Sequence, residues 1–193
     1  SININNKKFI EGYWQSYKYF DHKNQFLRNQ LCIPKYLTKR TLNISKTLSN
    51  CNSVGVHFRF YEKDILSKYN LNIIYYVNAI RYIKRKVNSP KFYIFTDNTI
   101  LAKKLLKDLD IEYELISKAS LISNEVNELY LLSLCRHVII SNSTFSWWGA
   151  WLTDKDKKII ISPDIFLNGP YCAWGFDGLI PEHWIKLPVL NFI

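Results

Sequence analysis

From residue 54 onward, short runs of β-branched and aromatic residues alternate with longer stretches of helical periodicity, and this alternation limits the possible folds severely. Strands joined through helices pair in parallel, because each helical crossover returns the chain to the same edge of the sheet. We therefore predict an α/β domain with a mostly parallel sheet and helices on both faces. The expected strands are Val54–Phe58, Lys91–Thr96, Tyr113–Ile116, Val138–Ser141 and Lys158–Ser162, and the expected helices are Ile73–Val87, Thr99–Leu109, Glu125–His137 and Thr144–Leu152.

The first fifty residues differ in character, because aromatic clusters there are followed by polar segments with helical periodicity. A chain of 193 residues can form one well-buried domain with an appended helical part, but not two full domains. We expect residues 1–50 to form a helical segment packed on a main domain of residues 51–193.

The net charge of +10, from 26 Lys and Arg against 16 Asp and Glu, favours an anionic ligand, an acidic membrane surface or nucleic acid. The basic runs Arg81–Lys86 and Lys103–Lys107 fall in helical stretches and are interpreted as solvated helix faces. Nucleic acid is the least favoured partner, because the aromatic residues follow core patterns rather than interleaving with lysines. No apolar run is long enough for a membrane span.

The four cysteines lie far apart in the sequence, with no C-x-x-C pair and no histidine at zinc-site spacing. We expect no metal site and interpret them as ordinary thiols, with a disulfide left open for a secretory compartment. They are Cys32, Cys51, Cys135 and Cys172.

Ligands of an open parallel sheet bind beyond the carboxyl ends of its strands, and the loop after Val54–Phe58 is rich in functional groups. Arg59 offers a planar fork of donors that suits a diphosphate, although a surface arginine is an equal alternative. His57 is either a partner for the edge of a base or a satisfied core histidine, which is the commoner case. Glu62 and Asp64 follow on the same loop.

Two further loops could contribute to the same site. Asp97 either faces a ligand or belongs to the start of a helix, and helix capping is the simpler interpretation. Residues 142–144 lead into an aromatic helix whose first N–H groups and partial positive charge suit a phosphate. An N-cap by Ser143 is the structural alternative, and both roles are compatible. The tryptophans of this helix are interpreted mainly as packing residues.

Several segments together resemble glycosyltransferase family 11, the α-1,2-fucosyltransferases. Gly12–Phe20 is similar to the family's G-Y-W-Q-S-x-K-Y-F segment, and Phe92–Asp97 to its F-Y-I-F-S-D strand. Leu129–His137 and Ser141–Trp151 are similar to L-x-L-M-S-x-C-x-H and N-S-T-F-S-W-W-G-A-W, and Pro181–Ile185 to a motif near the family's C-terminus. The resemblance covers nearly the whole chain.

The resemblance implies a Rossmann-like donor-binding domain, the C-terminal half of a GT-B-type enzyme. It implies inverting, metal-independent transfer of fucose from GDP-fucose to the 2-hydroxyl of a galactoside, without a cofactor. His57 would contact the guanine region and Arg59 the diphosphate, and Ser143–Ser146 would cradle phosphate. Glu128 stands where the family usually has aspartate. The expected donor-binding residues are His57, Arg59, Asp97, Glu128, Asn142, Ser143, Thr144, Phe145 and Ser146.

Two departures separate this chain from the family pattern. The family's H-x-R-R-G-D motif corresponds to residues His57–Asp64 of this chain. Phe60 stands in place of the second arginine. The glycine-rich G-G-L-G-N-Q opening is not found. We therefore expect that the acceptor domain either lies on a longer precursor or is missing altogether. A non-catalytic nucleotide-sugar or glycan-binding module is therefore the alternative to an enzyme.

The remaining expectations concern chemistry and location. Asp64 or Glu62 is the candidate general base of transfer. We expect a cytoplasmic protein or one peripheral to a membrane, or a Golgi-lumen protein if an anchor precedes the chain. The sequence gives no oligomeric state.

Overall fold

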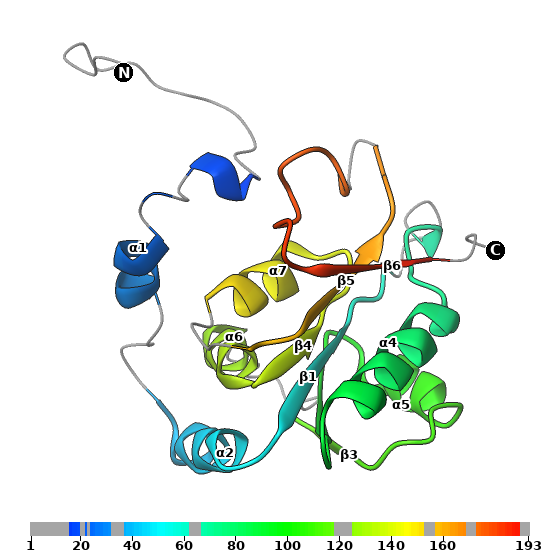
Figure 1. Ribbon diagram of the computed structural model, residues 1–193. Coiled ribbons are helices and arrows are strands. Elements are labelled where there is room, and N and C mark those ends of the chain that lie inside the picture. The colour runs from blue at the N-terminus through cyan, green and yellow to red at the C-terminus, as the bar shows by residue number, and fades with distance from the viewer. Residues whose placement is uncertain are drawn as a thin grey trace.

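The computed structural model of the protein describes residues 16–19, 22, 24–31, 37–61, 67–117, 125–152, 157–168 and 173–189. Six strands form one sheet of order β3-β2-β1-β4-β5-β6, and every neighbouring pair is parallel (Figure 1). The strand order reverses between β1 and β4, as in Rossmann-like domains. The strands are β1 Ser53–Phe58, β2 Lys91–Thr96, β3 Tyr113–Leu115, β4 His137–Ile139, β5 Ile160–Asp164 and β6 Ile185–Pro188.

Helices cover both faces of the sheet, so the predicted α/β architecture is confirmed. α4 (Ile73–Lys86) and α5 (Thr99–Leu106) pack on one face, where their apolar residues join one buried cluster. α6 (Glu125–Leu134) and α7 (Thr144–Trp151) pack on the other face, and α2 (Lys39–Ser49) lies against α6. The 3₁₀ turn η1 (Tyr17–Tyr19) and α1 (Asn24–Leu31) precede α2 in the chain.

β1 supplies both cores by the two-residue alternation of a strand. Val54, Val56 and Phe58 point into the cluster beneath α4 and α5. Gly55 points to the opposite face, where a Cβ atom on it would lie 2.6 Å from Leu132 Cδ1 of α6. The absence of a side chain at this position therefore lets α6 lie close to the sheet.

α6 and α7 make a similarly close contact. A Cβ atom on Gly149 of α7 would lie 2.6 Å from Leu132 Cδ2. Leu132 thus fills the space above two glycines, one in β1 and one in α7. This packing fixes where α7 begins relative to the end of β1.

The expected strands and helices are all present among the described residues, with ends that differ by at most three residues. β6 was not expected, because its four residues alternate half-buried with exposed positions and end in Pro188. Such an edge strand carries little apolar signal. α1 and α2 lie in the expected N-terminal helical segment, and the division at residue 50 stays a prediction. Among the described helices, none combines the length and apolarity needed to cross a bilayer.

Candidate functional site at the carboxyl edge of the sheet

The loops after β1, β2 and β4 meet at the carboxyl edge of the sheet, where the strand order reverses. Phe58 at the end of β1 is in register with Thr96 at the end of β2. The residues that follow these two strands are therefore neighbours. α7 begins five residues after β4. It lies on the face of the sheet toward which the His57 side chain of β1 points.

His57 is buried on the α7 side of β1. Its Nδ1 lies 2.8 Å from Ser141 Oγ, and its ring centroid lies 5.2 Å from that of Phe145. Ser141 Oγ is in turn 3.4 Å from Ser146 Oγ in the first turn of α7. Burial, aided by the nearby charge of Arg59, lowers the pKa of His57 to about 3. The imidazole is therefore neutral at physiological pH and serves as a hydrogen-bonding group rather than a cation.

The start of α7 lacks the side-chain cap that the sequence suggested as an alternative. Ser143 occupies the N-cap position with extended backbone, but its hydroxyl makes no capping hydrogen bond. Instead, the Ser146 hydroxyl donates to the Ser143 carbonyl oxygen at 3.1 Å. Thr144 is exposed and Phe145 is half-buried at the same helix end. The first N–H groups of α7 therefore donate no hydrogen bond to the Ser143 hydroxyl oxygen.

Arg59 and Asp97 form an ion pair between the loops after β1 and β2. Arg59 Nη1 lies 2.6 Å from Asp97 Oδ2, and the other Asp97 carboxylate oxygen accepts from the Phe60 N–H at 3.0 Å. The capping role expected of this loop belongs to Asn98, whose Oδ1 accepts from two N–H groups of α5. Asp97 therefore holds the Arg59 loop against the end of β2.

Tyr61 connects the Arg59 loop to the loop after β4, a role that was not expected for it. Its ring lies beneath the Arg59 guanidinium, 5.2 Å from the centroid, and its hydroxyl donates to the Asn142 carbonyl oxygen at 3.1 Å. Asn142 Nδ2 donates to the Tyr69 carbonyl oxygen at 2.9 Å. The signal in the sequence that could have identified Tyr61 was its position two residues after Arg59. Asn142 is thus buried within the scaffold of the site.

Glu128 lies on α6 and contacts a different part of the carboxyl edge. Its Oε2 accepts from Ser117 Oγ at 2.6 Å, and Ser117 Oγ accepts from the Thr96 N–H at 2.9 Å. Burial raises the pKa of Glu128, while the Ser117 hydrogen bond and the charge of Arg40 oppose that rise. Glu128 is therefore hydrogen-bonded to Ser117, just after β3, and through it to the end of β2, rather than to the group around His57.

The candidate bases Glu62 and Asp64 lie outside the described residues. Phe60, at the position of the family's second arginine, is described and half-buried. Its ring stacks on Phe58 with centroids 6.3 Å apart, in the cluster beneath α4. The substitution thus places an aromatic ring on the sheet face opposite His57.

The tryptophans of α7 are core residues, as expected. Trp147 and Trp151 are both buried and stack with centroids 6.2 Å apart, and Trp147 Nε1 donates to the Leu179 carbonyl oxygen at 2.8 Å. Trp184, from the C-terminal motif, lies 5.8 Å from the Trp147 ring. This aromatic packing secures α7 on the sheet, while its N-terminal end remains at the carboxyl edge.

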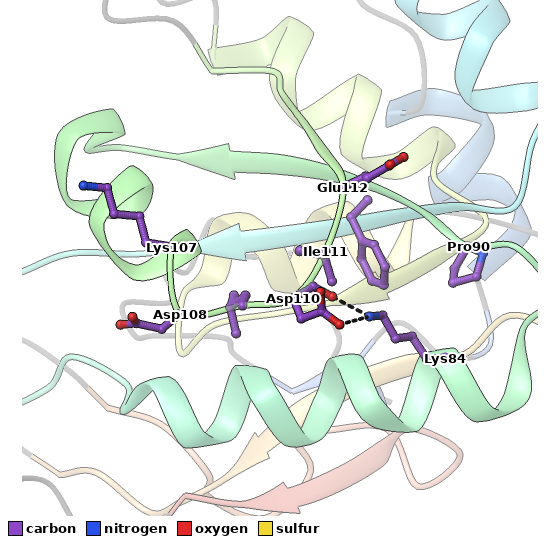
Figure 2. A pocket seen from close by; sticks show the side chains of 9 residues that line it. Lys84, Pro90, Lys107, Asp108, Asp110, Ile111 and Glu112 are labelled. Atoms are coloured by element: carbon purple, nitrogen blue, oxygen red, sulfur yellow. Dashed lines mark hydrogen bonds and ion pairs between the residues drawn. The ribbon is translucent and has the colours of Figure 1, made fainter.

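A separate hollow lies at the amino edge of the sheet, between the end of α4 and the loop before β3 (Figure 2). Lys84 donates there to the Asp110 carbonyl oxygen and lies 3.6 Å from its carboxylate. Phe92 and Ile111 supply apolar lining. It is at the opposite end of the strands from His57 and Arg59, and thus is no part of their site.

Comparison with known proteins gives one family and two curated relatives. Residues 1–173 match the description "Glycosyl transferase family 11". An alpha-1,2-colitosyltransferase of Escherichia coli is 30% identical over 96% of this chain and 65% of its own length. The O-antigen biosynthesis glycosyltransferase WbnK of Escherichia coli is 30% identical over 85% of this chain and 52% of its own length. The chain therefore spans less than two thirds of either relative.

Solved structures with a similar arrangement include the fucosyltransferase NodZ from Bradyrhizobium. It is 19% identical, with a TM-score of 0.43, over 61% of this chain and 43% of that chain. KpsC of Thermosulfurimonas dismutans, described as a β-Kdo 2,4 transferase, is 11% identical with a TM-score of 0.39, over 70% of this chain and 48% of that chain.

Proposed function

Because the chain belongs to glycosyltransferase family 11, we propose that it binds the GDP part of GDP-fucose and serves the transfer of fucose to the 2-hydroxyl of a galactoside. The observation that carries the proposal is the convergence of Arg59, His57 and the start of α7 where the strand order reverses. A guanidinium and a helix N-terminus are both suited to a diphosphate.

The proposed chemistry is in-line attack of a sugar hydroxyl on the anomeric carbon, with inversion and with GDP as the leaving group. Negative charge grows on the diphosphate as the glycosidic bond breaks. Arg59 and the N–H groups of α7 would stabilise that charge more in the transition state than in the ground state, which is the condition for catalysis. Arg59 can offer donors for this purpose, because a guanidinium carries five N–H groups and 42% of the Arg59 side chain is exposed beside its pair with Asp97.

His57 is assigned to the guanine region in this proposal. Its Nδ1 is engaged by Ser141, so a contact with a base would use Nε2. A neutral imidazole can donate or accept according to its tautomer, and it adds no cation to the site. His57 would thus help to recognise the base, whereas Arg59 would bind charge. Glu128 and Asp97 stay candidates for further donor contacts.

Several parts of the proposal rest on the family resemblance alone. Asp64 or Glu62 is the proposed general base, and independence of a metal and of any cofactor is part of the same proposal. The names of the two Escherichia coli relatives support a glycan acceptor, and they make colitose a second sugar to test. The GT-B arrangement, with an acceptor domain supplied elsewhere, is likewise proposed.

Isothermal titration with GDP and GDP-fucose tests donor binding, with a colitosyl donor in parallel. Arg59→Gln removes a charge-assisted contact, so we expect affinity for GDP to fall roughly ten- to a hundred-fold. Arg81→Gln is the matched control, because Arg81 is an exposed arginine on the outer side of α4. Equal GDP affinity of wild type and Arg59→Gln would refute the assigned role of Arg59.

The second candidate is a nucleotide-sugar or glycan-binding module without catalysis. It is favoured by Phe60, whose ring packs on Phe58 where the family carries a second arginine. GDP binding without sugar transfer to any galactoside, measured on the longest natural form of the protein, would support this alternative. Transfer of fucose or colitose would exclude it.

A further inference from the structure

The outer surface of α4 carries a line of exposed residues opposite its buried side. Ile74, Arg81 and Arg85 are spaced by seven and four residues, so they align along one side of the helix. The buried residues Tyr76 and Ile83 lie on the opposite side. The sequence of α4 contains no acidic residue.

α5 repeats this arrangement. Ile100, Lys103, Lys104 and Lys107 are all exposed and follow a three-, four- and seven-residue spacing from Ile100. Ile100 is 79% exposed, which is unusual for an isoleucine in the first turn of a helix. α5 also contains no acidic residue.

The two lines lie on one side of the molecule and run in the same direction. Both helices pack into the same apolar cluster, so their outer sides face away from the same face of the sheet (Figure 1). Each helix follows the carboxyl end of a strand, β1 for α4 and β2 for α5, and leads back to the amino edge. The exposed isoleucines therefore lie at the end of the helices nearest the candidate site, and the cations follow behind them.

We propose that this surface docks on an anionic lipid bilayer. We call it the α4–α5 basic face and define it by the residues that form the two lines. They are Ile74, Arg81 and Arg85 of α4, Ile100, Lys103 and Lys104 of α5, and Lys107, the residue directly after α5. Exposed isoleucines and basic residues on one side of amphipathic helices suit the boundary between headgroups and acyl chains.

The same cations could attract nucleic acid, but the isoleucines favour a bilayer. A phosphodiester backbone gains nothing from Ile100, and the face has no aromatic side chain on which bases could stack. A bilayer uses both parts, because the isoleucines insert and the cations meet lipid phosphates. The proposed occupant is therefore the lipid surface.

Acidic residues at the far end of the face fix the orientation of docking. Asp108, Asp110 and Glu112 lie between α5 and β3, around the hollow at the amino edge (Figure 2). Asp110 also binds Lys84 and so neutralises a cation on the flank of α4. These carboxylates weaken the attraction of the neighbouring cations to an anionic bilayer, whereas the apolar isoleucine end can insert. The carboxyl edge, with Arg59 and the start of α7, is thus held toward the membrane.

Vesicle flotation tests the proposal with the whole 193-residue chain. The probes are vesicles of phosphatidylcholine alone and of an equimolar mixture of phosphatidylcholine and phosphatidylglycerol, in low- and high-salt buffer. We expect binding to the mixed vesicles only, weakened by salt. One cation near an anionic surface contributes about five-fold in affinity, so Arg81→Gln/Lys104→Gln should weaken binding roughly 25-fold. Ile100→Ser should weaken it without changing the salt dependence.

The matched control is Lys39→Gln/Lys46→Gln, which removes the same charge from α2 on the other side of the sheet. Equal losses in the two double variants would overturn the proposal, because net charge rather than the face would then govern binding. Absence of vesicle binding, or retention of the protein by duplex DNA instead, would also overturn it. GDP titration of each variant measures the donor site independently of vesicle binding. Failure of the proposed function is therefore distinguishable from failure of this inference.

Discussion

Burial of His57 makes the stability of this protein sensitive to mild acid. Its pKa is about 3 in the folded protein and 6.5 in the unfolded chain. Between these values the unfolded state binds the extra proton, so the free energy of unfolding falls as pH falls. The full contribution is present above the unfolded pKa. Acidification from pH 7 to pH 5 removes about 2 kcal/mol through this one residue.

His137 adds a second loss of the same sign. Its pKa is lowered to about 4, first by burial and then by the charges of Lys158 and Arg136. Protonation of the unfolded chain at this position removes about 2 kcal/mol more over the same interval. Neither loss is complete at pH 5, because folded pKa values of about 3 and about 4 leave the native imidazoles mostly neutral there, and both losses grow further as the pH falls toward those values. The two histidines together therefore account for roughly 4 kcal/mol, a large share of the stability of an ordinary domain.

Urea unfolding at pH 7 and pH 5 measures the effect. His57→Gln removes the titrating ring and retains a hydrogen-bonding side chain opposite Ser141, so it should lower the pH-dependent loss by about 2 kcal/mol. His137→Gln should do the same, and His183→Gln, which removes an exposed imidazole, provides the comparison. The test compares the loss between the two pH values, so any constant cost of a substitution cancels. An identical loss in wild type and His57→Gln would refute the reasoning.

Three further substitutions test packing and ion pairing by chemical denaturation. Gly55→Ala should destabilise the protein by about 1–3 kcal/mol, because the new Cβ meets Leu132 Cδ1 at 2.6 Å; an unchanged midpoint would show that Leu132 can move aside. Tyr75→Phe should cost about 1–2 kcal/mol, since a buried hydroxyl no longer donates to two carbonyl oxygens; a neutral result would contradict this assignment. Asp97→Asn should change stability by less than about 1 kcal/mol, because both members of its pair with Arg59 are partly exposed, and a larger loss would mean that the pair supports the fold.

The sheet was predictable because its signal is local. β1 and β2 are short runs that are buried except for Lys91 and are rich in valine, isoleucine and phenylalanine, and Asn72 and Asn98 cap the helices that follow them. β6 lacked this signal, because it is recognised by its backbone pairing with β5 rather than by its own side chains. Local patterns therefore located the strands that carry the site, and missed an edge strand.

The partners within the site were not predictable from the same patterns. Arg59 and Asp97 are separated by 37 intervening residues, and only the register of β1 with β2 makes the loops that hold them neighbours. A helix cap was expected in the loop after β2, and the structure has one there. The residue that makes it is Asn98, so the Asp97 carboxylate pairs with Arg59 instead. Sequence identifies which loops converge, whereas the choice of hydrogen-bond partner depends on atomic distances that the fold sets.

The segment from Ser141 to Trp151 combines a scaffold with a site, and its residues divide between the two by position. Its tryptophans and Gly149 face the core, where Leu132 and the other rings hold α7 in place. Its first residues lie at the carboxyl edge, with Ser141 bonded to His57 and an extended N-cap that lacks a side-chain hydrogen bond. A helix end can offer its N–H groups to an anion only when the helix behind it cannot shift. The aromatic packing is therefore a condition for the proposed diphosphate site, although no tryptophan needs to contact the ligand.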